Sequence, residues 1–248
     1  MYLLSEARAP LFMNPKQPFK WGHFQSDIIL LCVRWYLRYP LSYRNLEEMM
    51  LERGLIVDHS TVYRWVQTYA PELEKRCRAY LKPTNDSWRV DETYIKVKGE
   101  WKYLYRAVDT SSNTLDFLLS AKRDARAAER FFRKALKSNH NSSPRVINVD
   151  KNAAYPKAID ELKKDQTLPK TAELRRVKYL NNIVEQDHRA LKRLVNPGMG
   201  FGAFNTARRT LRGYETMNMI RKGQIHGVEK GNIQAQAEFV SQIFGVTA

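Results

Sequence analysis

Residues 179–193 read Tyr-Leu-Asn-Asn-Ile-Val-Glu-Gln-Asp-His-Arg-Ala-Leu-Lys-Arg. This stretch predicts a helix, and the 3.6-residue period places Glu185 and Lys192, two turns apart, on one face of it. Two aspartates lie upstream in strand-like runs, Asp91 in Trp-Arg-Val-Asp-Glu-Thr and Asp150 in Val-Ile-Asn-Val-Asp-Lys. Three carboxylates followed by a lysine indicate metal-dependent chemistry on the phosphates of a nucleic acid.

The composition supports a nucleic-acid partner. The 248 residues include 42 Lys and Arg against 26 Asp and Glu, which gives a net charge of +16. Such an excess of positive charge attracts a polyanion. A basic protein with no nucleic-acid role is the alternative, because charge is only a property of composition.

The cysteines and the apolar runs indicate the cellular compartment of the protein. Cys32 and Cys77 show no spacing typical of a zinc site or a disulfide framework, which fits a reducing cytosol. No apolar run approaches the roughly 20 residues that span a bilayer, so we expect no membrane partner. The first twelve residues make a poor signal peptide, and we expect residues 1–23 to form a flexible arm of a cytoplasmic protein.

Three helices are predicted in residues 24–82. The first begins near Ser26 and ends before Pro40, and Ser42 and Asp58 are suitable N-caps for the second and third. The apolar stripe of the first helix comprises Ile28, Leu31, Cys32, Trp35, Tyr36 and Tyr39.

Two short helices joined by a tight, glycine-containing turn after a longer helix indicate a helix-turn-helix. In that motif the last helix enters the major groove of DNA, so its outward N-terminal residues are candidate DNA contacts. These residues are His59, Ser60, Thr61 and Arg64. An ordinary three-helix bundle with a solvated polar face is the alternative.

Residues 83–196 predict strands followed by alternating helices and strands. Strands are expected at 88–97, 101–109, 114–119, 145–149 and 174–179, and helices at 124–137, 153–164 and 179–193. This β-β-β-α-β-α-β-α order is that of the ribonuclease-H-like architecture, a mixed five-stranded sheet with helices on its faces. The whole chain is then an α+β or α/β protein in which a helix-turn-helix bundle precedes this domain.

In that architecture the first and fourth strands are neighbours. Asp91 and Asp150 are therefore expected to lie together, and the last helix is expected to bring Glu185 over them. Two Mg²⁺ ions about 3.5–4 Å apart, with Mn²⁺ as a substitute, can activate a nucleophile and stabilise a leaving oxygen. We predict that Asp91 bridges the two ions, that Asp150 and Glu185 each bind one, and that Lys192 contacts a DNA phosphate.

Three other carboxylates lie close to these positions in the sequence. Glu92 is expected on the opposite face of the sheet from Asp91, because strand side chains alternate. Asp109 is a candidate structural or supporting residue, and Asp187 is expected to lie off the face of Glu185.

Residues 197–248 predict a basic, helical C-terminal region. The basic run begins on the preceding helix with Arg189 and Arg193, which are candidate contacts for a DNA backbone. A solvated helix face explains the same pattern equally well.

Four stretches carry a resemblance to a known family. They read Val-Asp-His-Ser-Thr-Val-Tyr-Arg-Trp-Val-Gln at 57–67, Val-Asp-Glu-Thr-Tyr-Ile-Lys-Val at 90–97, Trp-Lys-Tyr-Leu-Tyr-Arg-Ala-Val-Asp at 101–109 and Lys-Tyr-Leu-Asn-Asn-Ile-Val-Glu-Gln-Asp-His at 178–188. From about Met13 to about residue 222 the chain resembles the bacterial DDE transposases of insertion sequence family six. The 34 residues between Asp150 and Glu185 match the spacing in that family, and Lys192 matches its following basic residue.

The resemblance implies a function. It implies 3′-end cleavage at terminal inverted repeats, strand transfer into target DNA and replicative formation of cointegrates. It also implies double-stranded DNA partners, a homodimer or higher oligomer, and association with the bacterial nucleoid. Two alternatives stay open: a non-catalytic helix-turn-helix protein, such as a repressor or degenerate transposase, and a nuclease on the same fold, which leaves the helix-turn-helix unexplained.

Overall fold

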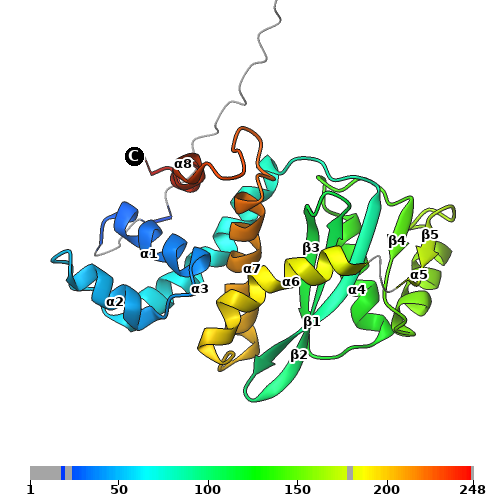
Figure 1. Cartoon of the computed structure of the whole chain (residues 1–248), viewed down its shortest axis with the longest axis horizontal. Helices are drawn as coiled ribbons and strands as arrows, with labels where there is room; N and C mark the ends of the chain where they lie inside the picture. Colours follow the sequence, from blue (N-terminus) through cyan, green and yellow to red (C-terminus); the bar gives the residue numbers. More distant parts are fainter. Residues whose placement is uncertain (1–17, 20–23, 178–180, 247–248) are drawn as a thin grey trace, which may run out of the picture.

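The computed structural model describes residues 18–19, 24–177 and 181–246 (Figure 1). Most of the expected arm at residues 1–23 and the end of the fifth expected strand, at Tyr179, lie outside these ranges. Within the arm, Phe19 is buried, and the centroid of its ring lies 4.8 Å from the centroid of the Tyr69 ring.

The three N-terminal helices form where the sequence predicts them. They are α1 (Ser26–Arg38), α2 (Tyr43–Leu51) and α3 (His59–Cys77). Ser42 and Asn45 form a capping box at the start of α2, and the Asp58 carboxylate accepts a hydrogen bond from the Ser60 amide at 2.7 Å. These caps fix the starts of α2 and α3.

The predicted apolar stripe of α1 is partly wrong. Cys32 and Tyr36 are buried, but Ile28, Leu31, Trp35 and Tyr39 are only partly covered. The other buried side chains are Ile29, Leu30, Val33 and Leu37. The buried face is rotated because α1 packs against C-terminal helices as well as against α3.

The central sheet has the predicted topology. Its strands are β1 (Ser87–Val97), β2 (Glu100–Asp109), β3 (Thr114–Ser120), β4 (Val146–Asn148) and β5 (Glu173–Arg175). They lie in the order β3-β2-β1-β4-β5; the first three are antiparallel, and β4 and β5 run parallel to β1. The β1–β2 turn is Lys98-Gly99, with φ of 51° and 80°, as a type I′ hairpin requires. The ribonuclease-H-like fold is thus confirmed.

Helices cover both faces of the sheet. One face packs on α4 (Ala125–Leu136) and α5 (Ala154–Lys164) through a core that includes Trp88, Tyr105 and Phe131. The other face packs on α6 (Asn182–Val195), which crosses β1 and β2 (yellow in Figure 1). Alternate residues of β1 therefore face two different cores.

The C-terminal helices complete the N-terminal bundle. Helix α7 (Phe204–Arg221) follows a short 3₁₀ turn (Asn196–Gly198) and lies along α3, and α8 (Ile233–Ile243) packs on α1, α3 and α7 (Figure 1). One hydrophobic core joins these helices to the α6 side of the sheet. Residues 24–82 and 197–248, which were expected to form separate regions on either side of the domain at 83–196, therefore share one hydrophobic core.

None of the helices in the described ranges is both long enough and apolar enough to cross a membrane.

Candidate active site

The edge of β1 opens where β4 ends. Strand β4 pairs only with Ser87, Trp88 and Arg89 of β1, so the next residues of β1 have no strand beside them on that side. The chain that leaves β4 carries Asp150 to this opening. There, one carboxylate oxygen each from Asp91, Glu92 and Asp150 lie within 4.8 Å of one another. The structure thus brings together two of the three predicted carboxylates, from positions 59 residues apart in the sequence.

Asp91 is held by a histidine that the sequence analysis did not select. The Nε2 atom of His188 on α6 lies 3.2 Å from Asp91 Oδ2, and His188 Nδ1 lies 3.1 Å from Arg106 Nη1. Because a guanidinium can only donate, Nδ1 accepts, and the imidazole proton sits on Nε2 and is donated to Asp91. Burial lowers the pKa of His188, which favours this neutral form.

A buried ion-pair network supports that histidine. Arg106 has no exposed side-chain surface, and its guanidinium donates to both oxygens of Glu215, at 2.6 and 2.8 Å, and to Asp187 at 2.6 Å. Lys222 Nζ lies 2.6 Å from the other oxygen of Asp187. Burial raises the pKa of Asp187, but Arg106 and Lys222 outweigh it and lower that pKa to about 2. The network ties α6 and α7 to β2.

Asp187 therefore lies off the face of Glu185, as expected, but it is a structural ion-pair partner. A signal for this network was present in the sequence. Glu215 is a lone carboxylate in the basic run that ends at Lys222, and a single acid on the apolar side of a helix needs a buried cation. Asp109 is also structural, because it accepts hydrogen bonds from the amides of Ser111, Asn113 and Asn85.

Asp150 and Glu92 share a second network. Arg123 Nη2 donates to Asp150 at 3.1 Å, and its Nε donates to Glu92. Glu92 also accepts from Asn152 at 3.0 Å and from the hydroxyl of Tyr155. Tyr155 belongs to α5, so Glu92 does point to the opposite face from Asp91, as expected. Sequence periodicity gave no indication that it also lies close to Asp150 at the sheet edge.

Glu185 lies in the first turn of α6, three residues before His188. The start of this helix is attached to β1, because Asn181 Nδ2 donates to the carbonyl oxygen of Val90 at 3.2 Å. Within the described ranges, the Glu185 carboxylate is exposed, makes no hydrogen bond or ion pair and lies outside the 4.8 Å cluster. Lys192 is exposed two turns further along. Their roles stay predictions.

The aspartate pair fits a divalent cation. Asp91 and Asp150 are partly exposed and offer hard oxygen ligands on the open edge of the sheet. Asp150 already accepts hydrogen bonds from Arg123 and from the Asn152 amide, and both oxygens of Glu92 accept from Arg123, Asn152 and Tyr155. Glu92 is buried, whereas Asp91 and Asp150 are partly exposed, so the two aspartates are the better ligands and Glu92 is better placed to position Arg123 and Asn152 around them.

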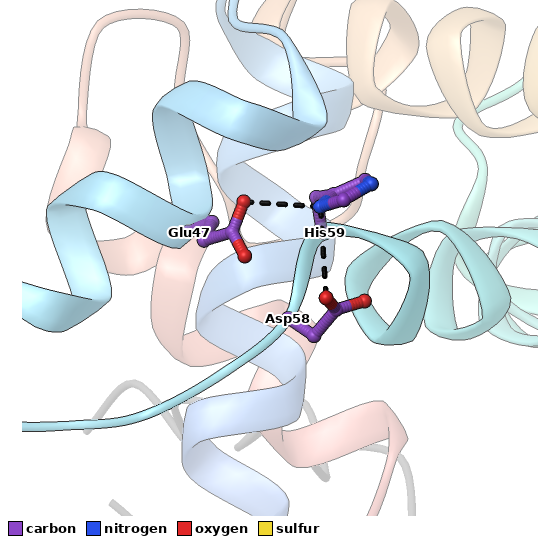
Figure 2. Close-up of side chains that lie close together, drawn as sticks. All are labelled: Glu47, Asp58 and His59. Atoms are coloured by element: carbon purple, nitrogen blue, oxygen red, sulfur yellow. Dashed lines mark hydrogen bonds and ion pairs between the residues drawn. The ribbon is translucent and has the colours of Figure 1, made fainter.

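The start of α3 presents a mixed surface. Figure 2 shows His59 between two carboxylates: its Nδ1 lies 3.0 Å from Glu47 Oε2 of α2 and 3.7 Å from Asp58 Oδ2. These contacts join the beginning of α3 to α2. The predicted contact of His59 with DNA stays a prediction.

The other predicted DNA contacts differ in exposure. Ser60 and Arg64 are exposed, whereas Thr61 is partly buried and accepts a hydrogen bond from Arg64 Nη2 at 3.0 Å. Arg189 and Arg193 are exposed on α6. Exposure alone does not show whether these residues contact DNA, so their roles stay predictions.

Comparison with known proteins agrees with this geometry. The family model described as the DDE domain matches residues 85–224. The transposase for insertion sequence-like element IS431mec of Staphylococcus aureus strain N315 is 40% identical over 208 residues, which cover 82% of this chain and 88% of the relative. The transposase of element IS257 in transposon Tn4003 of Staphylococcus aureus gives the same identity and coverage.

The fold and the paired aspartates define a DDE catalytic domain, the domain of enzymes that transfer polynucleotide strands. The chain belongs to the DDE transposases of insertion sequence family six.

Solved structures offer more distant likenesses. The HTLV-2 integrase catalytic core domain, in complex with magnesium in a trimeric form, is 21% identical, with a TM-score of 0.38 over 47% of this chain and 73% of that one. The catalytic core domain of BIV integrase is 14% identical, with a TM-score of 0.42 over 60% and 88% of the two chains.

Proposed function

We propose that this protein binds the terminal inverted repeats of an insertion sequence, cleaves the 3′ ends with Mg²⁺ and transfers them into target DNA. The route is replicative and forms cointegrates. The observation that supports the proposal most is the approach of Asp91 on β1 to Asp150, two residues past the end of β4, with oxygens within 4.8 Å at an open sheet edge. The 40% identity to transposases adds to it.

Each residue has a defined part in this proposal. Bound Mg²⁺, or Mn²⁺ in its place, would polarise the scissile phosphate and lower the pKa of the attacking water or hydroxyl. Asp91 and Asp150 hold the ions, and His188 fixes the Asp91 carboxylate through its Oδ2. Glu185 completes the ligand set from the first turn of α6, and Lys192 binds a phosphate of the DNA strand.

The proposal also assigns the partners. The helix-turn-helix reads the element end through His59, Ser60, Thr61 and Arg64, and His59 also joins α3 to Glu47 of α2. Two ends must be held together for coupled strand transfer, so the active form is a homodimer or a higher oligomer. The protein acts on nucleoid DNA in the bacterial cytoplasm.

Strand transfer in vitro tests the proposal. Purified protein is mixed with a labelled duplex of the inverted repeat flanking the gene and with a plasmid target, with and without Mg²⁺. We expect Mg²⁺-dependent joining that Asp91→Asn and Asp150→Asn each abolish while duplex binding persists. Asp160→Asn, on the exposed side of α5, is the matched control.

The separate position of Glu185 favours one rival, a DNA-binding copy without catalysis. Duplex binding without any Mg²⁺-dependent joining by the unmodified protein would establish that rival. Joining by either Asp91→Asn or Asp150→Asn at the rate of the unmodified protein would contradict the assignment of the aspartates.

A further inference from the structure

A cleft of about 350 Å³ lies between the end of α1, helix α6 and helix α7. Four arginines from these three helices line it, and we call it the arginine cleft. They are Arg38 from α1, Arg189 and Arg193 from α6, and Arg221 from α7. Arg38 and Arg221 are partly buried, and Arg189 and Arg193 are exposed.

Among the described residues, none of the four guanidinium groups forms an ion pair with a carboxylate. Glu215 is the one carboxylate among the described residues that line the cleft, and both of its oxygens already bind Arg106. Arg221 donates a hydrogen bond to the neutral side chain of Asn218, at 2.8 Å.

The charges in the cleft repel one another. Burial lowers the pKa of Arg221, and the nearby charges of Arg38 and Arg193 lower it further; the charge of Asp187 raises it but does not reverse the shift. Like charges gathered in a concave surface without a partner destabilise the free protein and are relieved when an anion enters. The arrangement therefore favours an anionic ligand.

The chemistry of the side chains narrows the ligand. Guanidinium groups match the oxygens of a phosphate with two parallel hydrogen bonds. Four of them along one cleft match a ligand with several phosphates at regular intervals better than a single small anion. The sugar-phosphate backbone of a nucleic acid has that character.

The position of the cleft indicates that the nucleic acid is duplex DNA. Arg189 and Arg193 lie four and eight residues after Glu185, one and two turns along the same helix. Arg38 is the last residue of α1, in the helical bundle that presents α3. The cleft thus lies between the recognition helix and the candidate active site, where duplex DNA held by both would pass.

We propose that the arginine cleft binds the phosphate backbone of duplex DNA between the recognition helix and the active site. The proposal rests on the proposed function of the protein as a transposase. The cleft holds the duplex by charge alone and reads no bases, so its contribution is the same for an element end and for an unrelated sequence.

The experiment measures duplex binding by fluorescence anisotropy, in EDTA so that cleavage cannot occur, over a series of salt concentrations. The test protein is the full chain with Arg38→Gln and Arg221→Gln, which keeps most of each side-chain stem. The control is the full chain with Arg126→Gln and Lys157→Gln, two exposed basic residues on α4 and α5 without ion pairs among the described residues. Both proteins lose the same charge.

Two duplexes are compared, one with the sequence of an element end and one with an unrelated sequence. We expect the test protein to bind each of them about tenfold more weakly than the unmodified protein does. The slope of log affinity against log salt should be smaller by about two, one for each lost phosphate contact. The control should match the unmodified protein. Equal affinity and slope in the test and control proteins would overturn the cleft proposal and leave the transposase proposal intact. No binding of either duplex by the unmodified protein would overturn both.

A second measurement does not depend on folding of a variant. The unmodified protein is treated with the arginine reagent hydroxyphenylglyoxal, and the modified residues are identified by mass spectrometry. Bound duplex should protect Arg38, Arg189, Arg193 and Arg221 and leave Arg126 reactive. Unchanged reactivity of the four in the presence of saturating duplex, or equal protection by inorganic phosphate at the same ionic strength, would refute the proposal.

Discussion

Asp91 and Arg106 lie opposite each other in the antiparallel β1–β2 pair, and the imidazole of His188 bridges their side chains. Arg106 is fully buried and paired with Glu215 and Asp187, so it cannot move without breaking two ion pairs. A rigid interior group thus fixes the tautomer of a histidine that in turn orients a candidate metal ligand. The interior of the protein and its active site are coupled through one hydrogen-bonded chain.

His188→Ala should weaken metal-dependent activity without abolishing it. Loss of a hydrogen bond to a metal ligand typically reduces metal affinity or activity 10- to 100-fold, so we expect roughly that loss. His188→Gln keeps an N–H donor and should recover much of it. The measurements are the Mg²⁺ concentration for half-maximal cleavage and Mn²⁺ binding by titration calorimetry. A His188→Ala protein with unchanged Mn²⁺ affinity would show that the bond to Asp91 has no positioning role.

Arg106→Met should destabilise the protein by about 3–5 kcal/mol, because it leaves the buried carboxylates of Glu215 and Asp187 without their cation. Arg106→Lys should restore only part of the lost free energy of unfolding, since a single ammonium group cannot make the same paired contacts with both carboxylates. Arg126→Met, at an exposed position of α4, should change stability by less than about 0.5 kcal/mol. Denaturant unfolding measures all three, and equal stability of the Arg106→Met and Arg126→Met proteins would contradict the assignment.

The Asp187 pairs should stabilise the fold in a pH-dependent way. The pKa of Asp187 is about 2 in the folded protein against an ordinary 3.8. A carboxylate whose pKa is lowered by folding stabilises the folded state fully at a pH above its ordinary pKa. For Asp187 this contribution to the free energy of unfolding is about 2 kcal/mol, and it is lost as the pH falls through 3.8 toward 2. The stability gap between the unmodified protein and Asp187→Asn should therefore shrink as the pH falls through that window.

Urea unfolding at neutral pH and within the acidic window measures this gap. Asp160→Asn serves as the control, because Asp160 is exposed on α5. A gap for Asp187→Asn that stays constant across the acidic window would mean that its carboxylate is not held ionised by Arg106 and Lys222.

Gly213→Ala should disturb the junction of α1, α3 and α7. A methyl group at this position would lie 2.6 Å from a methyl carbon of Leu37 and 2.7 Å from the Cβ of Ala70. Overpacking of this kind destabilises by about 1–3 kcal/mol. Gly202→Ala is the matched control, because a Cβ there meets nothing within 4 Å. Thermal unfolding distinguishes the two, and a Gly213→Ala protein as stable as the control would show that the helices separate easily.

The sequence predicted well what depends on local pattern. The strand limits at 88–97 differ by one residue from β1, because aromatic and β-branched residues end at a Lys-Gly turn. The caps Ser42 and Asp58 fixed the starts of two helices. The order of the elements then specified the pairing of β1 with β4, and with it the approach of Asp91 to Asp150.

Contacts between distant segments were not predictable in the same way. The buried face of α1 depends on α7 and α8, which lie more than 160 residues later in the chain. Glu92 was set aside by strand alternation, although the short β4 leaves the edge open and Asp150 reaches Glu92 there. The His188 bridge needs the register of Asp91 against Arg106, which no single stretch of sequence encodes.

The central claim is that Glu185 joins Asp91 and Asp150 in catalysis. The most direct test is the single-turnover rate of Mg²⁺-dependent 3′-end cleavage by Glu185→Gln, with duplex binding measured in parallel and Glu229→Gln as an exposed control. We predict that Glu185→Gln binds the duplex normally and cleaves at least about a thousandfold more slowly, equivalent to about 4 kcal/mol of transition-state stabilisation. Cleavage by Glu185→Gln at the rate of the control would contradict the account.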